Sequence, residues 1–171
     1  DAMGDALRRL GVSALATGQV DGVQLFMPSH IDADFALRNR HILQHRRGAG
    51  FWLWKPFLLN RTLHGMEEGD LLMYVDAQLT FTSSASPLFE LAEKEPSGVV
   101  CFGMAVHSER KFSKRKVLSE LGCSQAACLD APQRAATFIL FRNSPQTRTF
   151  VEHWLTLCER SELINDDEEE G

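Results

Sequence analysis

The chain contains no apolar run long enough to cross a lipid bilayer, so no transmembrane helix is expected in its 171 residues. It also lacks a Walker phosphate loop, a Gly-x-Gly-x-x-Gly loop, a Gly-x-Ser-x-Gly turn and a His-Glu-x-x-His pair. These absences argue against a phosphate-loop nucleotide hydrolase, a dinucleotide-binding dehydrogenase, a serine hydrolase and a zinc peptidase. No signal peptide is recognised, and a helical pattern starts at once without an initial Met, which suggests an excised or incomplete domain.

Cysteine is scarce, and its spacing fits no common metal or redox motif. The four cysteines are Cys101, Cys123, Cys128 and Cys158, and none forms a Cys-x-x-Cys pair. Cys101 and Cys158 fall in apolar surroundings. The sequence therefore predicts buried free thiols rather than a disulfide framework.

Positive charge is in the minority, with 18 Lys and Arg against 23 Asp and Glu, which gives a net charge of −5. This balance argues against a nucleic-acid partner. Much of the negative charge lies at the end of the chain, so we expect residues 166–171 to form an acidic, disordered tail.

The pattern that is present is an alternation of strands and helices. Short apolar runs bounded by turn residues predict strands at 23–27, 71–75, 98–102 and 137–141. Helical spacing and capping residues predict helices at about 2–15, 32–46, 56–63, 88–94, 113–121 and 145–159. We therefore expect a single α/β domain over residues 1–165, a sandwich with a mostly parallel sheet.

Asp76 follows the apolar run 71–75, which predicts a strand buried on both faces. Ligands in open α/β sheets bind outside the carboxyl ends of strands. A carboxylate there can hold a divalent cation that binds diphosphate oxygens, and the alternative is a capping or turn aspartate. Gln78 stands where a second carboxylate would complete an Asp-x-Asp pair, and it offers an oxygen without charge.

Cations and glycines precede the helix that leads into this strand, in the run Arg46-Arg47-Gly48-Ala49-Gly50. Positive charge beside a helix N-terminus suits a phosphate site, and a solvated basic turn is the common alternative. Lys55 lies among apolar residues and needs a partner. Trp52 and Trp54 alternate in side, so one could stack on a base or sugar ring, although core packing of both is the favoured expectation.

Two polar stretches further along the chain could border a ligand. Residues 111–116 are basic and include Lys114 and Arg115, and the favoured alternative is a surface helix with solvated lysines. Residues 130–136 lead through Gln133 into an apolar strand. The small residues of this stretch permit close approach of a ligand, or they form only a turn.

Together these stretches resemble a family signature. Residues Gly50-Phe51-Trp52-Leu53-Trp54-Lys55-Pro56, Gly69-Asp70 and Tyr74-Val75-Asp76-Ala77 resemble the Gly-aromatic-Trp-x-Trp-Lys-Pro, Gly-Asp and Tyr-x-Asp-Ala blocks of GT-A-type glycosyltransferase-like proteins from bacteria, algae and large algal viruses. Segments 112–115, 130–133, 136–139 and 151–155 are similar to the same group in the same order, so the resemblance covers about residues 28–167. The Trp-x-Trp-Lys-Pro block is its most specific part.

The resemblance implies a Rossmann-like GT-A three-layer sandwich that binds a nucleotide sugar. It implies a glycosyltransferase that moves the sugar to a glycan or other hydroxyl acceptor. Mn²⁺ or Mg²⁺ would bind at Asp76 and Gln78 and neutralise charge on the departing nucleoside diphosphate. The residues implied for the nucleotide-sugar site are Arg47, Trp52, Lys55, Asp76, Ala77, Lys114, Arg115 and Gln133, the last three bordering the donor sugar or the acceptor pocket.

The chain departs from this signature at Gln78 and at Lys116, where the family tends to have Asp. Against the family pattern it also lacks a first strand and a later segment containing His and Asp, so the implied domain is truncated at both ends. One alternative is a non-catalytic nucleotide- or sugar-binding module, or an inactive fragment of such an enzyme. Another is a different α/β enzyme that acts on phosphorylated sugars. The residues leave open the donor, the acceptor, the stereochemistry, the oligomeric state and the choice between the cytoplasm and the Golgi lumen.

Overall fold

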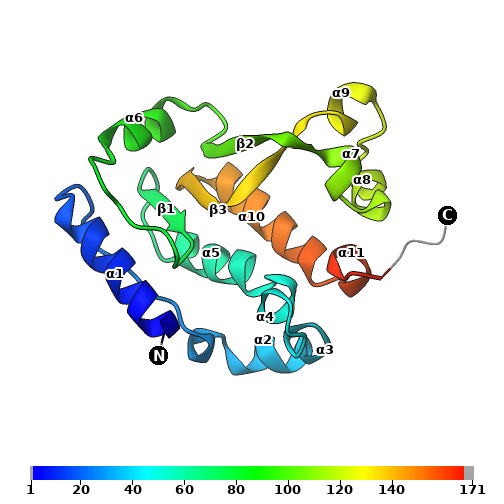
Figure 1. The fold of residues 1–171 in the computed structure, drawn as a ribbon, viewed down its shortest axis with the longest axis horizontal. Helices are drawn as coiled ribbons and strands as arrows, with labels where there is room; N and C mark the ends of the chain where they lie inside the picture. The colour runs from blue at the N-terminus through cyan, green and yellow to red at the C-terminus, as the bar shows by residue number, and fades with distance from the viewer. Residues whose placement is uncertain (1, 168–171) are drawn as a thin grey trace.

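The computed structural model describes residues 2–167, which form a mixed α/β fold with helices on both faces of a small sheet (Figure 1). The strands are β1 (Leu71–Val75), β2 (Val99–Ser108) and β3 (Pro132–Arg142). The longer helices are α1 (Ala2–Ala16), α5 (Trp54–His64), α6 (Ser86–Lys94) and α10 (Pro145–Cys158). The shorter elements are η1 (Pro28–His30), α2 (Ala33–Arg38), α3 (Arg40–Leu43), α4 (Gly48–Phe51), α7 (Glu109–Phe112), α8 (Arg115–Glu120), α9 (Ala126–Leu129) and α11 (Ser161–Ile164). No helix among the described residues has the length and apolar character needed to cross a bilayer.

The sheet has the order β1-β3-β2, and both pairings are antiparallel. The prediction of a mostly parallel sheet is therefore wrong for the described residues. β1 and β2 do run in the same direction, because each is antiparallel to β3. The reversal of β3 follows from its connection to β2, which consists of the three short helices α7, α8 and α9 rather than one long crossover helix (Figure 1). The sequence shows that a strand is present at 137–141 but does not show its direction.

Alternation along the strands sends side chains to two different helical layers. On one face, Ile139 and Phe141 of β3 pack with Leu59 and Leu63 of α5 and with Val151 of α10. On the other face, a separate cluster joins the sheet to α6 through its buried members Ala92, Val100 and Leu140. The sheet is thus covered on both sides, as the apolar run 71–75 predicts.

Most of the expected elements are confirmed, but the first strand is not. The expected strand 71–75 coincides with β1, and the helices expected at 2–15, 88–94 and 145–159 correspond to α1, α6 and α10. Residues 23–27 form no strand and belong to no sheet of the described structure. The helix expected at 32–46 is divided into α2 and α3 at Asn39, whose side chain donates to the Phe35 carbonyl and to Glu159.

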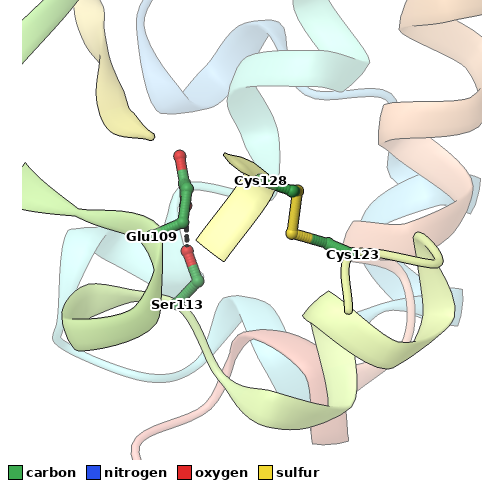
Figure 2. Close-up of a disulfide and its surroundings, with 4 residues drawn as sticks. All are labelled: Glu109, Ser113, Cys123 and Cys128. Atoms are coloured by element: carbon green, nitrogen blue, oxygen red, sulfur yellow. Dashed lines mark hydrogen bonds between the residues drawn. A yellow bond between two sulfur atoms is a disulfide. The ribbon is translucent and has the colours of Figure 1, made fainter. Parts of the chain in front are cut away.

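A disulfide joins Cys123 to Cys128, as Figure 2 shows. The prediction of free thiols is confirmed for Cys101 and Cys158 and wrong for this pair. The reason is local: Gly122 takes a positive φ of 68° after α8, and the chain turns back through α9. The two Cα atoms then lie 5.6 Å apart, within bridging distance.

Thiol titration checks this arrangement. We expect two reactive thiols in the unfolded, unreduced chain and four after reduction. In the folded protein at pH 8, alkylation should be slow, because burial raises the pKa of Cys158 to about 11 and also raises the pKa of Cys101. The thiolate is the reactive form. Four reactive thiols before reduction would contradict the disulfide.

Candidate functional site

The candidate site is centred on Asp76, at the carboxyl end of β1. Tyr74 and Asp76 are two residues apart, so both side chains point to the sheet face that α5 covers. On α5, Lys55, Leu59 and Leu63 recur every four residues and form its inward stripe. The apolar pair packs in the core, and Lys55 is left facing the end of β1.

Three side chains and one carbonyl group meet at this point. The Lys55 ammonium donates to the Ala136 carbonyl at 2.7 Å and to Asp76 Oδ1 at 3.2 Å. It also lies over the Tyr74 ring, with Nζ 4.6 Å from the ring centroid. The Tyr74 hydroxyl donates to the same Oδ1 atom. The two most characteristic blocks of the sequence, which contain Lys55 and Tyr74-Val75-Asp76-Ala77, are therefore in direct contact.

Burial controls the protonation of this group. Lys55 is only 4% exposed, and loss of solvent lowers its pKa, while the Asp76 carboxylate opposes that shift. Burial raises the pKa of Tyr74, and its hydrogen bond to Asp76 raises it further. The phenol therefore remains a hydrogen-bond donor at neutral pH and is unsuited to act as a base. Lys55 and Tyr74 hold Asp76 in place, and Lys55 itself has little surface to offer a ligand.

Asp76 can contribute one oxygen to a cation rather than a complete binding site. Oδ1 already accepts from Lys55 and Tyr74, and Oδ2 accepts no hydrogen bond from the described residues. Gln78 is exposed in the turn that follows. Within residues 2–167, no three His, Cys, Asp or Glu side chains gather closely enough to hold a metal ion. Asp76 and Gln78 fit Mg²⁺ or Mn²⁺ only as part of a coordination shell that substrate phosphates and water would complete.

The backbone before α5 is strained. Five consecutive residues, 48–52, have positive φ, and three of them are not glycine: Ala49 at 50°, Phe51 at 50° and Trp52 at 61°. The segment α4 is thus a left-handed turn, closed by bonds such as Phe51 N–H to the Arg47 carbonyl. Each non-glycine residue in this region costs about 1–2 kcal/mol, and such strain concentrates at functional sites. We therefore include this turn in the candidate site.

The left-handed turn presents Trp52 to solvent. Trp52 is 45% exposed, so the expectation of core packing is wrong for this residue, whereas Trp54 is half-buried and donates to the Gly48 carbonyl at 2.9 Å. A Cβ atom on Gly48 would lie 2.4 Å from the Trp52 ring, so the indole rests directly on the glycine. The Arg47 guanidinium lies 5.7 Å from the centroid of that ring. An exposed indole under a guanidinium offers both a flat apolar surface and a positive charge.

The other predicted site residues lie on two further segments. Gln133, near the start of β3, donates to the Ser113 hydroxyl at 3.1 Å, and Ser113 in turn donates to Glu109, as Figure 2 shows. Lys114 precedes α8, and Arg115 begins it. Ala77 follows Asp76 in a turn closed by the Leu79 amide and the Asp76 carbonyl.

Asp166, the first residue of the expected tail, and Asn165 just before it contact predicted site residues. Asp166 forms an ion pair with Arg47, and Lys114 donates to the carbonyl and side-chain oxygens of Asn165. The rest of the expected tail, 168–171, lies outside the described residues. The sequence analysis missed these contacts and also the role of Tyr74. Tyr74 could have been found from its two-residue spacing to Asp76, which places both side chains on one strand face.

Two surface hollows are lined by other described residues. One lies between α8 and α11 and is lined by charged residues that include Lys116, Glu120 and Arg160. Another lies among α2, α5 and α10 and includes Phe57, Arg61 and Glu152. Neither hollow contains the residues predicted for the nucleotide-sugar site.

Comparison of the chain with protein-family models, with curated proteins and with solved structures found no match. The interpretation of the site therefore depends on its residues and their geometry, together with the sequence blocks described above.

Proposed function

We propose that this chain is a GT-A-type glycosyltransferase domain that binds a nucleotide sugar and moves the sugar to a glycan or other hydroxyl acceptor. The observation that carries the proposal is the contact of Lys55 with Tyr74 and Asp76. This contact joins the two sequence blocks on which the resemblance chiefly depends. It also fixes a carboxylate at the carboxyl end of β1.

Five residues have definite tasks in this proposal. Asp76, with the exposed Gln78 beside it in sequence, would hold Mn²⁺ or Mg²⁺ jointly with the donor diphosphate. The bound cation would supply neutralisation of charge on the departing nucleoside diphosphate. Lys55 and Tyr74 hold the Asp76 carboxylate in place, and the exposed Trp52 ring suits stacking on a base or sugar ring.

A second candidate is a non-catalytic module that binds a nucleotide or sugar without a metal. The observation that favours it is the ion pair itself, because the Lys55 ammonium 3.2 Å from Asp76 weakens the attraction of that carboxylate for a cation. The two candidates differ in one measurable property, which is the dependence of nucleotide binding on a divalent metal.

The substitution Gln78→Asp distinguishes the metal-assisted transferase from the module without a metal. It does not disturb the core, since Gln78 is exposed. It completes an Asp-x-Asp pair, and the added charge should tighten Mn²⁺-dependent binding of a nucleoside diphosphate by roughly tenfold. Isothermal titration calorimetry measures this change. Gln24→Asp, which makes the same change at an exposed position of the 23–27 segment, should leave affinity unaltered. Equal affinities for the wild type and Gln78→Asp would favour the module without a metal.

The Cys123–Cys128 disulfide helps to choose between the two cellular compartments that the sequence leaves open. Disulfides persist in oxidising environments and are rare in the cytosol. Of the two compartments left open by the sequence, the Cys123–Cys128 pair therefore favours the Golgi lumen.

A further inference from the structure

Two predicted ligand-binding cations converge on one dipeptide of the same chain. Arg47, before α4, forms an ion pair with the carboxylate of Asp166. Lys114, before α8, donates to the Asn165 carbonyl at 3.2 Å and to its side-chain oxygen. Asn165 and Asp166 are adjacent, with Cα atoms about 3.8 Å apart, so two cations that are distant in sequence contact the same short stretch of chain.

We propose that Arg47 and Lys114 form an anion site for a diphosphate group, and that Asn165 and Asp166 occupy it in cis. This inference rests on the proposed function, because that function supplies the diphosphate. The oxygens of Asn165 and Asp166 take the places that phosphate oxygens would take. A diphosphate offers two charged groups, one for each cation.

The occupancy is weak enough to be reversed. The side chains of Arg47 and Asp166 are 59% and 52% exposed, and ion pairs in such surroundings contribute little and are screened by salt. A diphosphate carries more charge than the single carboxylate of Asp166, so it can displace the dipeptide. Arg47 remains positioned after displacement, because its guanidinium also lies over the Trp52 ring.

The substitution Asp166→Asn tests this occupancy with inorganic pyrophosphate as the probe. Calorimetric titration at low ionic strength should show about fivefold tighter binding to Asp166→Asn than to the wild type, in line with the loss of an exposed ion pair. Asp167→Asn removes the same charge one residue further on. Asp167 accepts from Asn165 and contacts neither cation in the described structure, so this control should bind as the wild type does.

Arg47→Gln in the Asp166→Asn background should remove the gain, since the site then lacks one cation. Equal pyrophosphate affinity in the wild type and Asp166→Asn would overturn the cis occupancy. An equal gain in Asp167→Asn would also overturn it, because the effect would then be one of general charge. Failure of pyrophosphate to bind any variant would overturn the anion site itself.

Titration of the same proteins with UDP and GDP separates this inference from the proposed function. A nucleotide that binds the wild type and Asp166→Asn equally would overturn the occupancy and leave the proposed function standing. A gain for pyrophosphate without binding of either nucleotide would retain the anion site and overturn the nucleotide-sugar proposal.

Discussion

Replacement of Lys55 by alanine is expected to lower the free energy of unfolding by about 3–5 kcal/mol. The Lys55 ammonium is the charged partner of Asp76, whose side chain is only 17% exposed. Its removal leaves a largely buried carboxylate without a counterion and the Ala136 carbonyl without its donor. Urea denaturation followed by circular dichroism measures the change.

Two comparisons show whether the cost comes from the unpaired charge. The ion pair between Arg110 and Asp130 has its side chains 55% and 60% exposed, so Arg110→Ala should cost far less stability than Lys55→Ala. The double variant Lys55→Met with Asp76→Asn should lose less stability than Lys55→Ala alone, because it leaves no isolated charge. A Lys55→Ala variant as stable as Arg110→Ala would contradict the buried pairing.

Substitution of Gly50 by alanine is expected to cost about 3 kcal/mol. Gly50 has φ of +95°, which disfavours any residue with a Cβ atom. A Cβ atom there would also lie 2.6 Å from the Cα atom of Leu43, and the α3 backbone cannot yield cheaply. The two penalties act together, and urea denaturation again provides the measurement.

Gly69 supplies a matched control, because it has nearly the same φ, +96°, with nothing within 4 Å of an added Cβ atom. Gly69→Ala should therefore show only the conformational cost, about 1–2 kcal/mol. The difference between the two variants measures the close approach of the left-handed turn to α3. Equal losses at both positions would show that this approach is not tight.

The stability of this turn matters for function because it presents Trp52. The indole rests on Gly48, and its neighbour Trp54 closes the turn through the Gly48 carbonyl. A relaxed turn would move the Trp52 ring and the Arg47 guanidinium above it. The strained backbone and the buried Lys55 pair thus hold in place two groups used in the proposed function, the Trp52 ring and the Asp76 carboxylate.

The sequence predicts local structure well where the pattern itself carries the physical cause. The apolar run 71–75 gave the correct limits of β1, and Asp32 and Ser144 cap α2 and α10 through the amides of Phe35 and Thr147. The need of Lys55 for a partner also followed from its apolar neighbours, and the structure supplies Asp76. These predictions depend on residues close together in the chain.

Features that depend on the path of the chain were not predicted. The direction of β3 is set by the three short helices before it, and the Cys123–Cys128 bond by a turn at Gly122. The exposed position of Trp52 follows from a left-handed turn that includes non-glycine residues, which composition does not reveal. The contacts of Arg47 and Lys114 with residues 165–166 are long-range ion pairs and hydrogen bonds, and no spacing rule points to them.

The most direct test of the proposed function is a calorimetric titration of the chain with UDP and with GDP, each with and without Mn²⁺. The proposal predicts that one of the two nucleotides binds, that binding requires Mn²⁺, and that Asp76→Asn weakens it while circular dichroism shows the fold intact. Binding that is indifferent to Mn²⁺ would contradict a metal-assisted transferase and favour the module without a metal. Absence of binding by both nucleotides in the presence of Mn²⁺ would contradict the nucleotide-sugar site at Asp76.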